Sequence, residues 1–87
     1  MEVKRRRVVK RGSRASTHFF ARARERWGFV PTRRERHAML VAWATGEALH
    51  ESGDIYWIEL RSVIRRVVIR AGWLITALPE IDTRLVG

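Results

Sequence analysis

Cysteine is absent from this sequence, and acidic residues are scarce. The chain has 87 residues, two prolines, and nine acidic residues against 18 lysines and arginines. Without cysteine there is no disulfide framework, no cysteine-ligated zinc and no thiol catalysis. No apolar run approaches the ~18 residues of a transmembrane helix, and no apolar stretch follows the basic start as it would in a secretory signal. We therefore expect a cytoplasmic protein that does not bind membranes.

Hydrophobic residues and positive charge are what the sequence has in abundance. Hydrophobic residues make up 46% of the chain and include four tryptophans, which predicts a folded core. A chain of this length fits one compact domain. Its formal net charge of +9 indicates an anionic partner such as a nucleic acid.

The positive charge is concentrated at the N-terminus. Residues 1–14 contain seven basic residues against one glutamate, a net +6, which leaves +3 for residues 15–87. We expect a flexible basic arm over residues 1–14, a single domain over residues 15–79 and a tail over residues 80–87. The arm has three interpretations: a phosphate-binding segment, a solvated tail, or a short edge strand. Its candidate nucleic-acid-binding residues are Lys4, Arg5, Arg6, Arg7, Lys10, Arg11 and Arg14.

Two helices are predicted first. Ser16 or Thr17 is a suitable N-cap for a helix that ends at Trp27, before Gly28. A capping box in residues 32–35 predicts a second helix over residues 33–45. The apolar spacing of the first helix places Phe19, Phe20, Ala23 and Trp27 on its inner face. The inner face expected for the second helix contains His37, Leu40, Val41 and Ala44, with Trp43 at its margin.

The pattern then changes from helical to alternating. Residues 55–60, 63–70 and 73–78 are rich in Ile, Val and Trp, which predicts strands joined by two-residue turns at 61–62 and 71–72. A further short strand over residues 47–51 is an option, and His50 is expected in a turn. The predicted fold is α+β, with two N-terminal helices packed on a three- to four-stranded antiparallel meander sheet.

Strict alternation through both turns assigns the side chains to two sheet faces. The more apolar face, expected to pack on the helices, includes three polar side chains: Tyr56, Arg65 and Thr76. An arginine there needs a partner or an anionic ligand, because a buried unpaired charge is costly. The opposite face carries Trp57, Arg66, Arg70 and Trp73. These four side chains suit base stacking and backbone binding, a protein-docking patch, or a face covered by the arm or by a second subunit in a homodimer.

Acid–base chemistry is suggested by three residues of the first helix. His18, Arg22 and Arg26 are spaced i, i+4 and i+8, so they share one strip. A histidine can transfer protons near neutral pH, and arginines can hold a phosphate, which together suit metal-independent RNA cleavage. If the helix crosses the sheet at this end, these residues converge with Tyr56, Arg65 and Thr76. The alternative is a set of solvated side chains, with an arginine neutralised by Glu25.

No metal or cofactor site is expected. The three histidines are dispersed, with His37 expected at a helix interface, and they lack a carboxylate cluster. There is no glycine-rich phosphate loop, which argues against nucleotide hydrolysis.

Residues 16–79 resemble small bacterial and phage domains related to the RelE-like ribonuclease toxins, which are grouped with barnase, EndoU and the colicin nucleases. The resemblance is carried by the helix from His18 to Gly28, by Gly46 after the second helix, and by three strand motifs. Those motifs are Ile55-Tyr56-Trp57-Ile58, Val67-Val68-Ile69, and Ile75-Thr76 followed by Pro79. The resemblance implies His18 as an acid–base residue, with Arg22, Arg26 and Thr76 lining a phosphate site. The tryptophan before Gly28 and the basic arm depart from the family pattern.

The leading prediction is a small basic nucleic-acid-binding protein similar to metal-independent endoribonuclease toxins, acting on RNA in preference to DNA. One alternative is a non-catalytic phage-type effector that inhibits a host protein, such as RNA polymerase or a defence nuclease. Another is a plain DNA- or RNA-binding module. Protein partners in these cases would be an antitoxin or the host enzyme.

Overall fold

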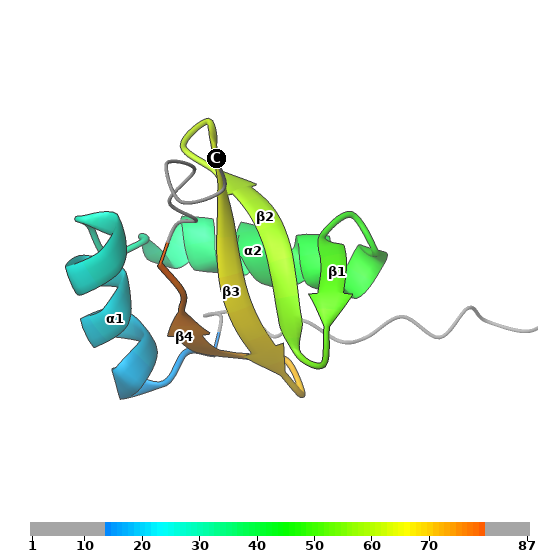
Figure 1. Ribbon diagram of the computed structural model, residues 1–87, viewed down its shortest axis with the longest axis horizontal. Coiled ribbons are helices and arrows are strands. Elements are labelled where there is room, and N and C mark those ends of the chain that lie inside the picture. The colour runs from blue at the N-terminus through cyan, green and yellow to red at the C-terminus, as the bar shows by residue number, and fades with distance from the viewer. Residues whose placement is uncertain (1–13, 80–87) are drawn as a thin grey trace, which may run out of the picture.

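The computed structural model describes residues 14–79 and has the predicted α+β architecture (Figure 1). The sheet order is β1-β2-β3-β4, with antiparallel neighbours, so the meander is confirmed. Helix α1 packs against β4 at one edge of the sheet, and α2 passes behind β2. The elements are α1 (Thr17–Trp27), α2 (Arg33–Thr45), β1 (Leu49–Ser52), β2 (Ile55–Leu60), β3 (Val63–Arg70) and β4 (Trp73–Ala77).

Both helices begin and end where the sequence predicts. The Ser16 hydroxyl accepts a hydrogen bond from the Phe19 amide, and Gly28 ends α1 at φ +86°, a conformation that favours glycine. In α2, the Thr32 hydroxyl accepts from the Glu35 amide while the Glu35 carboxylate accepts from the Thr32 amide, which confirms the capping box. No helix in the described range is long and apolar enough to cross a membrane.

The core lies between the helices and the inner face of the sheet. The inner face of α1 is confirmed, but that of α2 is rotated from the prediction: Val41 is exposed, and Met39 and Trp43 are buried. The observed face buries larger side chains and therefore removes more apolar area from water. The buried apolar residues are Phe19, Ala23, Trp27, Met39, Leu40, Trp43, Ala48, Ile58, Leu60, Val67, Ile69, Leu74 and Ala77.

The predicted register holds between β2 and β3 but fails within β4. Leu74 lies opposite Ile69, whereas Thr76 lies opposite Val68, so Ile75 has no partner across the ladder. This irregularity shifts the alternation by one residue. Thr76 therefore belongs to the outer face, and Ala77 is fully buried on the inner one, which corrects the predicted faces of both residues.

The first strand also differs from its prediction. It begins at Leu49, because the Ala48 amide donates to the Ala42 carbonyl and holds the preceding residues on α2. His50 lies in this strand opposite Tyr56, not in a turn. The strand is short, and all four of its residues are exposed.

Candidate nucleic-acid interface

The helix that carries His18, Arg22 and Arg26 forms as predicted. Both arginines, however, contact other groups of the protein. His18 is exposed in the first turn, and no described side chain or backbone group forms a hydrogen bond or ion pair with its ring. Arg22 pairs with Glu25 at 2.6 Å. Arg26 donates to the Ala77 carbonyl at 2.9 Å and so ties α1 to the end of β4. Within residues 14–79, the His18 imidazole therefore has no partner that would fix its orientation.

Arg65 lies at the other end of α1 from His18. Its side chain is 7% exposed, its Nε donates to the Leu60 carbonyl at 3.2 Å, and its guanidinium lies 5.5 Å from the Trp27 ring. Trp27 follows His18 by nine residues, which is about 13 Å along a helix axis. The structure therefore does not bring His18 and Arg65 together.

Thr76 and Tyr56 do not complete a cleft with His18 either. Thr76 is on the outer face of the sheet, whereas Arg65 is on the inner one. Tyr56 does share the inner face with Arg65, as predicted, but its ring packs against His50 of β1 at 5.1 Å. Two strands separate β1 from β4, where α1 packs. The six residues predicted for catalysis therefore do not line one cleft.

The arginines predicted to bind nucleic acid from the outer sheet face are paired with carboxylates. Arg66 forms a two-point contact with Glu51 at 2.9 and 3.0 Å, and its guanidinium lies 5.5 Å from the Trp57 ring. The hydrogen bond from Arg66 is the main reason that the pKa of Glu51 is lowered, and a bond from the Trp57 side chain adds to it. Arg70 pairs with Asp54 at 2.8 Å. This face consequently presents little net positive charge.

Trp73 and Arg14 make a different arrangement at the edge of β4. Trp73 is 41% exposed, and the Arg14 guanidinium lies 5.7 Å from its ring. Arg14 is held there because its carbonyl accepts from the Leu74 amide at 3.0 Å and the Ser16 amide donates to the Leu74 carbonyl at 2.9 Å. An exposed indole beside a fixed cation can stack on a base while the cation contacts phosphate. The basic residues 4–11 lie outside the described residues.

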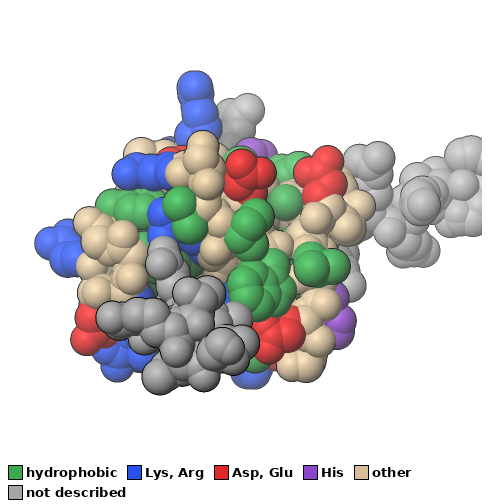
Figure 2. Space-filling model, turned by 45° about the horizontal axis from the view of Figure 1, so that its top comes forward, with side chains coloured by type: hydrophobic (Ala, Val, Ile, Leu, Met, Phe, Trp, Pro, Cys, Tyr) green, Lys and Arg blue, Asp and Glu red, His purple; other side chains and the backbone are tan. Residues whose placement is uncertain are grey.

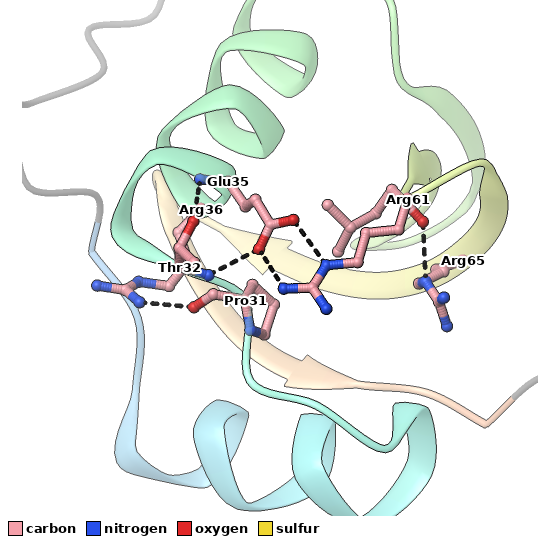
Figure 3. A network of polar contacts seen from close by, with 7 residues as sticks. Pro31, Thr32, Glu35, Arg36, Arg61 and Arg65 are labelled. Atoms are coloured by element: carbon pink, nitrogen blue, oxygen red, sulfur yellow. Dashed lines mark hydrogen bonds and ion pairs between the residues drawn. The ribbon is translucent and has the colours of Figure 1, made fainter.

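The sequence did not reveal a polar network where the connector between the helices meets the β2–β3 turn (Figure 3). Glu35 accepts two hydrogen bonds from Arg61, at 2.8 and 3.1 Å. Together with the Thr32 amide, Arg61 lowers the pKa of Glu35 to about 2. The guanidiniums of Arg61 and Arg65 lie 3.8 and 4.9 Å from the Phe29 ring. Both carboxylate oxygens of Glu35 are thus hydrogen-bonded within the protein. We call this network the brace, because it joins the helices and their connector to the β2–β3 turn.

The sequence predicts only one part of this network, the capping box. The capping box was readable because Thr32 and Glu35 are three residues apart, but Arg61 is 26 residues further along the chain. No local pattern marks such a pair. Nearby, Arg36 donates to the Pro31 carbonyl at 2.9 Å and lies 4.9 Å from the Phe20 ring, which joins the start of α2 to α1. Burial lowers the pKa of Arg36.

The unbalanced positive charge lies on the helices. Residues 14–46 contain seven arginines and two glutamates, a net +5, whereas residues 47–79 contain four arginines and four acidic residues, a net charge of zero. One of the two glutamates, Glu35, pairs with Arg61 of the second segment. Arg24 and Arg34 are exposed and form no ion pair with any residue in the described range. In Figure 2 the blue side chains gather mainly at the α1 side, and red carboxylates lie among the green side chains toward β1.

No protein-family model matches this chain, and comparisons with curated proteins and with solved structures found no match. The relationship to RelE-like toxins therefore stays a prediction. Within residues 14–79, no three histidine or acidic side chains lie close enough to hold a metal ion. What the described geometry offers is a set of exposed arginines on the two helices and, at the edge of β4, Arg14 beside the exposed Trp73.

Proposed function

We propose that this protein binds nucleic acid through its helical side and its basic N-terminal residues, without cleaving it. The observation that carries the proposal is the exposed pair of arginines, Arg24 and Arg34, that form no ion pair among the described residues. A guanidinium that is not paired internally is available to phosphate, and each phosphate contact releases condensed counterions. Arg14 beside Trp73 adds a place where an unpaired base can stack.

Charge placement supports binding by one side of the molecule. The arginines of the outer sheet face meet carboxylates at 2.8 to 2.9 Å, so phosphate would have to displace Glu51 or Asp54 there. At Arg24 and Arg34, phosphate would displace no carboxylate of the described residues. Residues 1–13 add six basic residues against one glutamate, so most of the protein's excess charge belongs to residues 1–46.

Cleavage is not part of the proposal, because His18 has no hydrogen-bond partner within the described residues and does not lie near Arg65. We expect labelled RNA to remain intact when it is incubated in EDTA with the wild-type protein or with His18→Ala. Cleavage by the wild type that the substitution abolishes would restore the endoribonuclease prediction.

The binding test is a fluorescence anisotropy titration of single-stranded RNA, with DNA of the same sequence in parallel. We expect affinity to fall between about 50 and 200 mM salt, with a slope of about −0.7 for each phosphate contact on a single strand. RNA is expected to bind at least as tightly as DNA. Affinity that is absent, or that does not change with salt, would overturn the proposal.

A further inference from the structure

Within residues 14–79, one edge of β2 is left open along half of its length. The β1–β2 ladder ends where Leu49 lies opposite Trp57, and no residue of β1 lies opposite Ile58, Glu59 or Leu60. The chain does not continue along β2, because the Ala48 amide donates to α2 instead. The other edge of β2 is covered by β3 along its whole length. An uncovered strand edge with free peptide groups can pair with another chain.

A groove of about 530 Å³ lies along this edge, between β2 and α2. Its helical wall contains Ala38 and Ala42, which are one helical turn apart and have the shortest side chains available after glycine. Larger residues there would fill the space beside the strand. The two alanines therefore leave the space beside β2 open.

The rim of the groove is apolar and acidic. Leu49 and Ile64 are 68% and 54% exposed, an unusual degree for large aliphatic residues that line one hollow. Glu47 and Glu59 also line it, and neither pairs with a cation in the described part of the chain. Figure 2 shows hydrophobic side chains with carboxylates beside them on this side of the molecule.

We propose that the open edge of β2 binds an extended segment of a protein partner in which aliphatic residues alternate with lysine or arginine. Side chains of an added strand alternate between the two faces of the sheet. Those on the inner face would meet Ala38 and Ala42, which suits aliphatic residues. Those on the outer face would lie beside Glu59, which is opposite Ile64 on that face, and this suits cations.

The charges also exclude nucleic acid as the occupant. Two carboxylates at the rim repel phosphate, so this surface is separate from the one proposed for nucleic acid. The protein as a whole carries +9, so a basic peptide binds only where carboxylates are concentrated. Non-specific attraction therefore cannot imitate the expected result.

The experiment is an anisotropy titration of the full chain with a labelled short peptide of alternating valine and lysine, and with an uncharged valine–serine peptide as the negative probe. We expect the lysine peptide alone to bind, and Glu59→Lys to weaken it by about tenfold. Ala42→Leu is expected to weaken it as well, by filling the groove, and the more exposed Ala38→Leu repeats that test with less risk to the core. Glu25→Lys and Ala21→Leu on α1 make the same chemical changes away from the groove and are expected to have no effect.

Amide chemical shifts locate the peptide. We expect the largest changes at Ile58, Glu59 and Leu60. Absent binding, equal binding by the groove and control variants, or shifts confined to other strands would overturn the proposal. Dimerisation of the free protein that Ala42→Leu abolishes would assign the groove to a second copy instead. Titration of RNA with the same variants separates the two proposals, since loss of peptide binding is expected to leave RNA affinity within about twofold.

Discussion

Residues 14–46 and residues 47–79 are equally long but carry very different charge. The helical segment has a net +5, and the sheet segment has a net charge of zero. In the sheet segment, Arg66 and Arg70 each have a carboxylate across a neighbouring strand or turn. In the helical segment, Arg24 and Arg34 have no such partner among residues 14–79. Arg66 and Arg70 of the sheet segment are thus neutralised by carboxylates, whereas Arg24 and Arg34 of the helical segment are left to the solvent or to a ligand.

The two segments also differ in their turns. Both helices end at glycine in the left-handed region, where glycine has no steric cost. The β2–β3 turn instead places Arg61 and Ser62 there, at φ +55° and +65°. Arg61 is held by Glu35 and Phe29, both of which belong to the helical segment. The brace between the segments therefore compensates for a turn that its own residues do not favour.

The difference in charge between the two segments is tested most directly by removing two arginines from each segment and measuring RNA binding. Arg24→Ala with Arg34→Ala is expected to weaken RNA binding by about tenfold to a hundredfold and to reduce the salt slope by about 1.4, because two phosphate contacts on a single strand are lost. Anisotropy titration over a salt series measures both quantities.

The matched control is Arg66→Ala with Arg70→Ala. It changes the net charge by the same amount, yet it is expected to alter RNA affinity only about twofold, through long-range attraction alone. If the sheet variant weakens binding as much as the helical one, the difference between the segments has no role in binding.

The brace is tested by Phe29→Ala. This substitution removes the ring over which two guanidiniums lie and leaves the buried Arg65 with only one of its two aromatic neighbours, Trp27. We expect it to lower the free energy of unfolding by about 2 kcal/mol, measured by urea denaturation. Val30→Ala in the same connector removes apolar area without touching the stack, and a loss as large as that of Phe29→Ala would contradict this account.

The ionic part of the brace is tested by pH. The pKa of Glu35 is lowered from 4.5 to about 2, so its ionised form stabilises the fold above pH 4.5, and this stabilisation is lost as the pH falls from about 4.5 to 2. Glu35→Gln is expected to cost about 1 kcal/mol at neutral pH, a small value because Arg61 is half-exposed and water screens the pair.

Unfolding free energies measured at several pH values check this prediction. The difference between wild type and Glu35→Gln should disappear near pH 2. Glu59→Gln, which removes a carboxylate without a described partner, should leave stability unchanged at neutral pH. A wild type and a Glu35→Gln variant that run parallel down to pH 2 would show that the pair contributes nothing.

The smallest expected effect concerns the β2–β3 turn. Ser62→Gly should raise the free energy of unfolding by about 0.5 kcal/mol, because glycine adopts φ +65° without steric cost. Thermal denaturation of the variant beside Ser52→Gly, at a position without a left-handed backbone, measures the gain. A loss of stability in Ser62→Gly would mean that the serine side chain supports the turn.

Much of the fold was predictable because its signals are local. The caps at Ser16 and Thr32 and the α1 face of Phe19 and Trp27 depend on residues within a few positions of one another. The register of β2 and β3 followed from a two-residue turn. Thr76 was assigned to the wrong face because nothing in the sequence marks Ile75 as the residue left unpaired. The face of α2 was misjudged because apolar residues surround that helix on more than one side.

The sequence alone determined the order of the elements, the positions of the helix ends and the excess of positive charge, since each depends on composition or on neighbouring residues. Which arginines are neutralised was decided only by the tertiary structure, because Glu35 meets Arg61 and Glu51 meets Arg66 through contacts between distant segments. The same holds for the separation of His18 from Arg65. Helix α1 packs along β4, so its two ends lie beside different parts of the sheet. The spacing of residues in the sequence does not predict which parts these are.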